Sequence, residues 1–271
     1  MRPVLVDTLL QMLNKKVHPV VPQIGSLGAS GDLAPLAHLA LVLTGEGEAE
    51  FGGTVMSGGA AMEKAGIAPL ELQAKEGLAL LNGTQAMSAM AVLLREDSGA
   101  LCKLADISGA MSIDATLSSR VPCDEEIHKL RPYPGAIAAA RNIRTLLEDS
   151  QILHSHEHCA RIQDPYSLRC LPQVHGAARD ALTHVDDMLK IEINAATDNP
   201  LVLNDGRVVS GGNFHGQPIA IRMDYLALGL HELGSISERR VDWVMNPNLT
   251  DLPAFLAPRD EPLTAVIALD V

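Results

Sequence analysis

The sequence predicts a mainly α-helical fold, a bundle of long helices with one or two small β-hairpins. Aromatic residues make up only 3 % of the 271-residue chain. Its core must therefore be built from Ala, Leu, Val, Ile and Met, which suits closely packed helices. Apolar residues also recur at helical spacing over long stretches. With 47 % hydrophobic and 20 % charged residues, the composition is that of a globular protein. We expect residues 1–271 to form a single domain.

Each expected element follows from local pattern. A helix is predicted over residues 2–14, then a loop over residues 17–31 that carries prolines and glycines. A second helix is expected from Asp32, a favourable N-cap residue, because Pro35 is tolerated in a first turn. Further helices are expected over residues 70–94, 100–115, 135–147, 173–194 and 218–244. Hairpins are predicted over residues 50–56 and 201–210, the second around Asn204-Asp205-Gly206.

Charge and cysteine content narrow the classes of function. The formal net charge of −12 argues against a nucleic-acid or anionic-membrane partner, because both need a basic surface. The four cysteines show no regular spacing, which indicates reduced thiols in a cytoplasmic protein. The uncharged run 77–94 is as long as a membrane span, but it contains Asn82 and Gln85, whose amides are costly in lipid. A helix buried within a bundle is the better interpretation.

The most unusual segment is GSLGASGDLAPL at residues 25–36. A flexible Gly/Ser loop that caps a helix is the ordinary interpretation. The segment matches neither GxxxxGK nor GxGxxG, so no phosphate loop is indicated. A second interpretation is that a tight turn presses the Gly31 nitrogen onto the Ala29 carbonyl carbon and closes a five-membered ring. Loss of two waters, one from Ser30, would leave an electrophilic methylidene group. Gly31 suits the attacking position because no side chain blocks its approach.

The segment GSLGASGDLAPLAHLAL resembles the signature of the aromatic amino acid ammonia-lyases, whose Ala-Ser-Gly becomes a methylidene-imidazolone (MIO). Four further motifs occur in the family's order: LLNGTQA at 80–86, QDPYSLRCLPQ at 163–173, TDNPLV at 197–202 and SGGNFHGQPIA at 210–220. The resemblance covers nearly all of the chain. It implies the long-helix fold of the fumarase/aspartase-like superfamily. Within the family, the resemblance is greatest to the histidine branch, through the motifs IHKLRPYPG at 127–135, FHGQP and QDPYSLRC. Ala136 and His175 depart from the residues that are usual in that branch.

The resemblance assigns roles residue by residue. It makes Ala29, Ser30 and Gly31 the cyclising triplet and Asp32 a residue that assists ring formation. Asn82 would hold the MIO carbonyl oxygen through its amide; an isolated buried Asn is usually only a satisfied polar group.

Three more positions come from the later motifs. Gln163 and Tyr166 belong to the QDPYSLR motif, and Tyr166 is expected near the prosthetic group. Arg169 would pair with the substrate carboxylate, a task that its planar guanidinium suits. Without the motif, a structural ion pair would be the better interpretation of Arg169. Phe214 is expected to pack close to the MIO.

The implied reaction is deamination of L-histidine to urocanate and ammonium, with no metal and no soluble cofactor besides the MIO. The alternatives are a tyrosine or phenylalanine lyase or aminomutase, and an inactive helical fragment in which the ring never forms. The family's residues for the substrate ring and its mobile-loop tyrosine have no counterpart here. We therefore expect the central part of a longer lyase chain, weak or inactive by itself, whose full-length form is a homotetramer acting on a small amino acid.

One competing pattern is the run of residues 154–159, His-Ser-His-Glu-His-Cys. His154 and His158 would share a helix face, as metal ligands often do. Glu157 does not complete an HExxH motif, however, so a solvated helix or turn is favoured over a metal-binding helical module.

Overall fold

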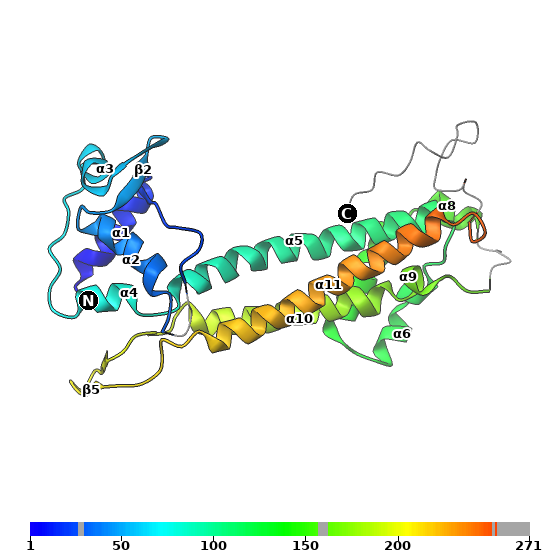
Figure 1. Cartoon of the computed structure of the whole chain (residues 1–271). Helices are drawn as coiled ribbons and strands as arrows, with labels where there is room; N and C mark the ends of the chain where they lie inside the picture. The colour runs from blue at the N-terminus through cyan, green and yellow to red at the C-terminus, as the bar shows by residue number, and fades with distance from the viewer. Residues whose placement is uncertain (27–29, 157–161, 251–252, 254–271) are drawn as a thin grey trace. The chain divides into compact units, whose positions relative to one another are not determined.

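The computed structural model describes residues 1–26, 30–156, 162–250 and 253 of the chain. These residues belong to two compact units. Unit 1 comprises Met1–Leu93 and Met188–Ile221, and unit 2 comprises Leu94–Asp187 and Arg222–Val271. The prediction of a mainly helical fold with long helices and small hairpins is confirmed (Figure 1). The prediction of a single domain stays a prediction.

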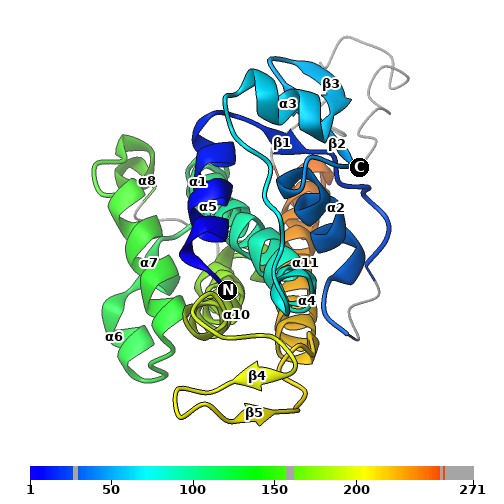
Figure 2. The ribbon, with the colours of Figure 1, turned by 90° about the vertical axis from the view of Figure 1, so that its left-hand side faces the viewer.

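Unit 1 combines short helices with a small sheet. Its elements before the first long helix are α1 (Pro3–Asn14), β1 (His18–Pro19), α2 (Leu33–Leu43), β2 (Glu48–Phe51), β3 (Thr54–Ser57), α3 (Gly58–Lys64) and α4 (Glu76–Leu81). Helix α2 packs against both α3 and α4, and Figure 2 shows α3 beside the β2–β3 hairpin. The core of this part includes Leu5, Met12, Leu43 and Met62, all buried.

The sheet of unit 1 has the order β1-β2-β3, with every pair antiparallel. The predicted hairpin is confirmed, with Glu48 opposite Ser57 and Phe51 opposite Thr54. Strand β1 pairs His18 with Glu50 and was not predicted. Two residues are too few for an alternating pattern, so the sequence carries no strand signal there.

The second hairpin also belongs to unit 1. Strands β4 (Leu201–Val202) and β5 (Val208–Val209) pair antiparallel, with Leu201 opposite Val209, as the Asn-Asp-Gly turn predicts.

Unit 2 is a helical assembly. It contains the 3₁₀ turn η1 (Val121–Cys123), the helices α6 (Glu125–Lys129), α7 (Pro134–Leu146), α8 (Gln151–Ser155) and α9 (Tyr166–Arg169), and most of the three long helices. These long helices are α5 (Gln85–Ala115), α10 (Leu171–Glu192) and α11 (Gln217–Met245). Buried Ile143, Leu171, Ile236 and Trp243 form its core.

The expectation of one helix over residues 70–94 is wrong. Residues 70–75 are not helical, α4 ends at Leu81, and the chain bends over residues 82–84 before α5 begins at Gln85. Lys75 has a φ of 74° and Gly83 a φ of 157°, and neither value continues a helix. The expected boundary between residues 94 and 100 is also wrong, because α5 runs through it. Ser98 Oγ donates to the Leu94 carbonyl within the helix, at 2.6 Å.

The apolar stretch Glu76–Ala115 is long enough, by length and composition alone, to cross a membrane, and a third of its most apolar window is buried. The core helix of a globular protein meets the same criterion. The bend at 82–84 and its polar contacts, which a lipid environment would penalise, favour a core helix.

Candidate active site

The start of α2 places the described part of the cyclising triplet in unit 1. Ser30 is exposed, whereas Gly31 is buried immediately before α2. Ala29 lies outside the described residues. Gly31 has a φ of +76°, in the left-handed region that side chains rarely adopt. A residue with a side chain would therefore be strained here, and glycine relieves that strain.

Gly31 lies directly against Gly83. A Cβ atom added at Gly31 would come within 2.4 Å of the Gly83 carbonyl oxygen and 2.7 Å of the Gly83 nitrogen. The Asp32 N–H donates to the same Gly83 oxygen at 2.7 Å. Gly31 and Asp32 are thus held by backbone contacts to the bend between α4 and α5.

Asp32 precedes α2 at the N-cap position, but its carboxylate makes no capping hydrogen bond. It is fully buried, and its two oxygens accept from Ser26 Oγ at 2.8 Å and from the Met87 N–H at 2.7 Å. The expectation that Asp32 caps the helix through its side chain is therefore wrong. The carboxylate joins the loop before the triplet to α5, since a buried carboxylate is stable only with such donors. Its role in ring formation stays a prediction.

Asn82 follows α4 and is buried. Its Nδ2 donates to Asp198 Oδ1 at 3.3 Å and to the Asn199 carbonyl at 3.2 Å. Lys75 Nζ lies 2.8 Å from Asp198 Oδ2 and completes the cluster. The amide donors thus face residues 198 and 199. That Asn82 holds the ring carbonyl stays a prediction.

The motif TDNPLV also anchors the loop that carries Phe214. Asn199 Oδ1 accepts from the Gly211 N–H at 2.8 Å, and Asn213 Nδ2 donates to the Ala196 carbonyl at 3.1 Å. Phe214 lies between β5 and α11, as expected, and is half-buried. Its packing against the MIO stays a prediction.

Three contributors to this part of the site were not predicted: Gly83, Thr84 and Thr197. Thr84 donates through Oγ1 to Glu192 Oε1 at 2.5 Å, and Thr197 Oγ1 accepts from the Thr84 N–H at 3.4 Å. Gly83 and Thr84 belong to the NGT motif and Thr197 to the TDNP motif. The motif letters therefore contained the signal, but the resemblance assigned a role only to Asn82.

The remaining predicted residues belong to unit 2. Tyr166 and Arg169 form the first and last positions of α9, and the Arg169 guanidinium carbon lies 4.8 Å from the centre of the Tyr166 ring. This is a cation–π distance. Tyr166 is 72 % exposed. The structure therefore places Ser30, Gly31, Asp32, Asn82 and Phe214 in unit 1, and Gln163, Tyr166 and Arg169 in unit 2.

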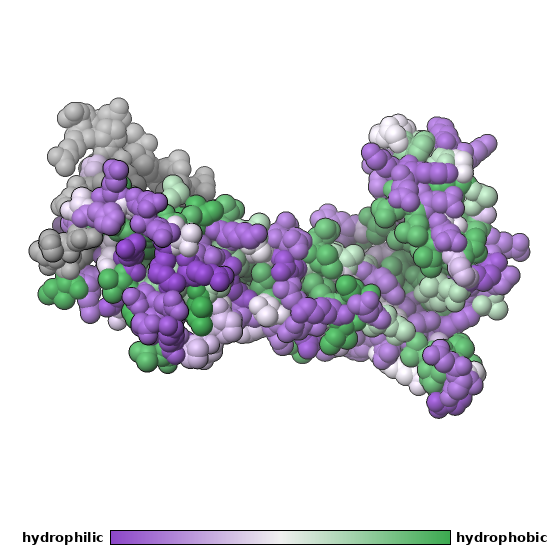
Figure 3. Space-filling view, turned by 180° about the vertical axis from the view of Figure 1, so that it is seen from behind, coloured by the Kyte–Doolittle hydropathy of each residue, from purple (hydrophilic) through white to green (hydrophobic). Residues whose placement is uncertain are grey.

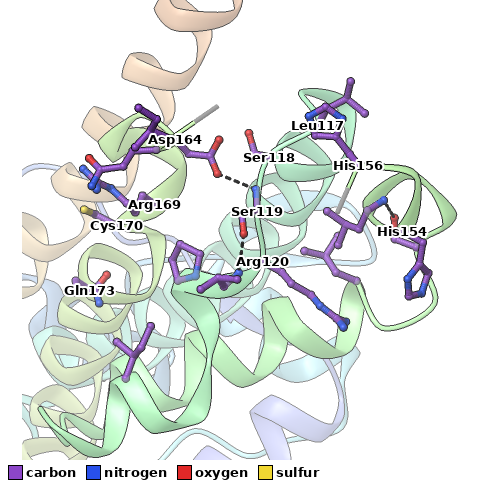
Figure 4. A pocket seen from close by; sticks show the side chains of 18 residues that line it. Leu117, Ser118, Ser119, Arg120, His154, His156, Asp164, Arg169, Cys170 and Gln173 are labelled. Carbon is purple, nitrogen blue, oxygen red and sulfur yellow. Dashed lines mark hydrogen bonds between the residues drawn. The ribbon is translucent and has the colours of Figure 1, made fainter. Parts of the chain in front are cut away.

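Gln163 and Arg169 line a cavity of about 810 Å³ in unit 2 (Figure 4). Asp164 at its rim accepts from the Ser119 N–H at 2.7 Å and holds the 117–121 turn. Arg120 also lines the cavity. Such a volume accommodates a small molecule, and a guanidinium on its wall suits a carboxylate.

The two positions that depart from the histidine branch have structural roles. His175 is 1 % exposed, and its Nδ1 lies 2.9 Å from Asp106 Oδ1. Asp106 also accepts from Asn142 Nδ2 at 2.8 Å and from Arg179. Ala136 is buried near the start of α7, where the helix meets Gly176 of α10.

The candidate metal run falls partly on residues that the structure does not describe, since Glu157, His158 and Cys159 are among them. Among the described residues, no three His, Cys, Asp or Glu side chains are placed to share a metal ion.

Comparison with known proteins gives one consistent result. The sequence profile described as aromatic amino acid lyase matches residues 1–268. The histidine ammonia-lyase of Myxococcus xanthus is 55 % identical over 249 residues, which are 92 % of this chain and 49 % of that protein. The chain spans about half the length of the curated relatives it matches.

Solved structures agree with this likeness in fold. The crystal structure of histidine ammonia-lyase from Trypanosoma cruzi matches with a TM-score of 0.85 and 41 % identity, covering 96 % of this chain and 48 % of that one. Tyrosine aminomutase from Streptomyces globisporus matches with a TM-score of 0.87 and 38 % identity, covering 97 % and 53 %. The chain therefore belongs to the aromatic amino acid lyase family.

Proposed function

We propose that this chain is the MIO-forming part of a histidine ammonia-lyase, which deaminates L-histidine to urocanate. The observation that carries the proposal is the close packing of Gly31 on Gly83 directly beside the exposed Ser30. The curated relatives named histidine ammonia-lyase, at 50–56 % identity, support the choice of substrate.

The residues at the start of α2 fit an MIO. Ring closure needs a residue without a side chain at position 31, and a Cβ there would meet the Gly83 carbonyl at 2.4 Å. It also needs a hydroxymethyl group whose oxygen can leave as water, and Ser30 is exposed. Once formed, the MIO supplies an electrophilic carbon for the substrate amine, which makes that nitrogen a better leaving group.

Residues of each unit would take part in binding and orienting the substrate. Arg169 would hold the carboxylate through its planar guanidinium. Tyr166, stacked on Arg169, would limit the rotation of the guanidinium and lie near the amine. Gln163 would donate from the same cavity wall. Phe214 would cover the ring region from the loop anchored on Asn199.

We further propose that the active enzyme is a homotetramer whose sites combine residues of several subunits. Unit 2 exposes apolar side chains along α5, namely Leu94, Leu101, Leu104, Ile107 and Met111. Hydrophobic surface lies open on the face of the molecule shown in Figure 3. Patches of this kind mark protein interfaces, and a second copy of the chain is the occupant we propose. The free thiols Cys102, Cys123 and Cys170 support a cytoplasmic location.

Intact-mass spectrometry tests the ring. We expect the purified chain to weigh about 36 Da less than its sequence mass, the mass of the two waters lost in cyclisation. The Ser30→Ala variant should show its full sequence mass. A wild-type chain of full mass would overturn the proposal and favour the inactive-fragment alternative.

A substrate assay tests the reaction. Because the chain spans half the length of its relatives, we expect it to show little turnover alone, and to form urocanate from L-histidine rather than coumarate or β-tyrosine from L-tyrosine. The aminomutase alternative rests on the matching fold of the solved tyrosine aminomutases. A β-amino acid product would favour that alternative and contradict the histidine assignment.

A further inference from the structure

We infer that Gly83 and Thr197 are positioning residues for the formation of the MIO, acting through the backbone behind the triplet. We call Gly83, Thr84 and Thr197 the shelf. The inference rests on the proposed function, because it concerns how the same ring comes to be closed.

The front of the shelf faces the triplet. The Gly83 carbonyl accepts from the Asp32 N–H at 2.7 Å, and the Gly31 Cα packs on the Gly83 backbone so closely that a Cβ would overlap three of its atoms, all within 2.9 Å. Both residues are buried. The Gly31 backbone therefore cannot move without breaking these contacts.

Thr197 leaves no space for a side chain at Gly83. A Cβ at Gly83 would lie 2.4 Å from the Thr197 carbonyl oxygen and 2.7 Å from Thr197 Oγ1. Thr197 is buried, and its Oγ1 also accepts from Gln85 Nε2 at 3.2 Å. Gly83 is thus enclosed by backbone on both sides. Only a glycine fits between Gly31 and Thr197.

The shelf is itself held in place. The Thr84 N–H donates to Thr197 Oγ1, and Thr84 Oγ1 donates to Glu192 at the end of α10. Asp32 reaches past the shelf to the Met87 N–H of α5. These bonds join Asp32, the bend and Thr197 to α5 and α10, so the backbone that Gly31 contacts is itself fixed.

Ring closure is a step that such a contact favours. The Gly31 nitrogen bonds to the Ala29 carbonyl carbon; its hydrogen and the former carbonyl oxygen leave with the Ser30 amide hydrogen as one water. The Ser30 hydroxyl and α-hydrogen leave as the second water. Because both reacting atoms belong to one turn, the rate depends on the population of the closed geometry. The shelf raises that population by holding the Gly31 backbone in one position.

The test compares conservative variants at Thr197 by intact mass at a fixed time after synthesis. We expect Thr197→Val to lower the fraction of chains that have lost two waters about tenfold. This corresponds to a barrier to cyclisation that is higher by about 1.4 kcal/mol. Thr197→Ser keeps the hydroxyl and should retain the wild-type fraction. Circular dichroism of both variants should match that of wild type, which shows that a lower ring fraction in Thr197→Val does not come from loss of the fold.

Gly83→Ala is the stronger variant. Its methyl group would displace the shelf, and we expect no detectable loss of water. Gly234→Ala is the matched control, because Gly234 in α11 has no atom within 4 Å of an added Cβ. It should cyclise as wild type does.

The outcomes separate the two claims. A wild-type chain that keeps its full mass overturns the proposed function and this inference with it. Normal wild-type dehydration together with equal ring fractions in Thr197→Val and Thr197→Ser overturns the inference alone. Full dehydration of a folded Gly83→Ala chain does the same.

Discussion

At the residue scale, the structure gives several charged side chains a fixed place. The Asp32 carboxylate accepts from Ser26 and Met87 and makes no capping bond to the helix it precedes. The carboxylate of Glu76 likewise joins two separate segments of the chain. Its oxygens accept from the Arg2 backbone N–H at 3.1 Å, from Arg2 Nε at 2.8 Å and from the Gln73 N–H at 2.8 Å. One carboxylate thus ties the start of α1 to the start of α4.

The Glu76 carboxyl gives a pH-dependent prediction. The side-chain hydrogen bond from Arg2, with the backbone N–H groups of Gln73 and Arg2, lowers the pKa of Glu76 from 4.5 to about 2 against the opposing effect of burial. A folded pKa below the unfolded one contributes stability above pH 4.5, and that contribution disappears as the pH falls through about 2.

The measurement is the melting temperature of wild type and Glu76→Gln against pH. We expect wild type to melt higher by a constant margin above about pH 5, and the margin to shrink toward zero near pH 2. Glu125→Gln, an exposed carboxylate on α6, is the control and should show little margin at any pH. A Glu76 margin that is independent of pH would contradict the assignment.

At the scale of elements, α7 and α10 meet at two glycines in unit 2. A Cβ at Gly176 would lie 2.4 Å from the Ala136 nitrogen, and one at Gly135 would lie 2.1 Å from the Gly176 carbonyl oxygen. Asp180 Oδ1 accepts from the Gly135 N–H at 2.8 Å and caps α7 from the neighbouring helix, since Tyr133 provides no side-chain cap. Backbone contact here sets the separation of the two helices.

We therefore predict that Gly176→Ala lowers the free energy of unfolding by about 1–3 kcal/mol, because the helices must separate to admit the methyl group. Urea unfolding followed by the fluorescence of Trp243 checks this, since Trp243 is the single tryptophan of the chain and lies in the core of unit 2. Gly234→Ala should be neutral or stabilising by up to about 1 kcal/mol. An unchanged midpoint for Gly176→Ala would show that the contact is looser than described.

The elements also show what the sequence could and could not predict. Long apolar periodicity located α7, α10 and α11 within a few residues of their ends. It failed over residues 70–94, where the bend at 82–84 depends on Thr197 and Asp198, more than a hundred positions later in the chain. Local pattern contains no information on such distant partners. For the same reason Asp32 was assigned a cap, although its partner Met87 is in a different helix.

The residues of the candidate site were likewise predictable only in part. Motif resemblance named Ser30, Gly31, Asp32 and Asn82, and of these Gly31 and Asp32 contact Gly83 in the bend between α4 and α5. It did not name Gly83 or Thr197, because their contribution is the space and the backbone they offer. That contribution becomes visible only when the three segments are placed side by side.

At the scale of the whole molecule, α5 exposes an apolar face on unit 2. Leu104 is 60 % exposed and Met111 is 67 % exposed, and both lie on unit 2. Each such side chain that becomes fully buried between two copies contributes about 1.5–3 kcal/mol to the free energy of their association.

We predict that the chain self-associates through this face and that Leu104→Glu weakens the association at least about tenfold, since burying an unpaired charge is costly. Sedimentation velocity over a concentration series measures it. Leu130→Glu, at an exposed leucine that follows α6, is the control and should associate as wild type does. A monomeric wild type at tens of micromolar, or equal behaviour of both variants, would contradict a role for the α5 face.

Asn199 contacts two separate segments of the chain. Its carbonyl accepts from Asn82 and from Lys75, while its side-chain oxygen receives Ser210 and Gly211 from the loop before Phe214. A substitution at Asn199 removes the contacts to Ser210 and Gly211 and, where it shifts the backbone carbonyl, also disturbs those to Asn82 and Lys75, so variants at Asn82 and in the 210–213 loop should be epistatic with it. The summed losses of the separate variants would then exceed the loss in the double variant, and neither segment could be retuned for a new substrate while the other stayed fixed.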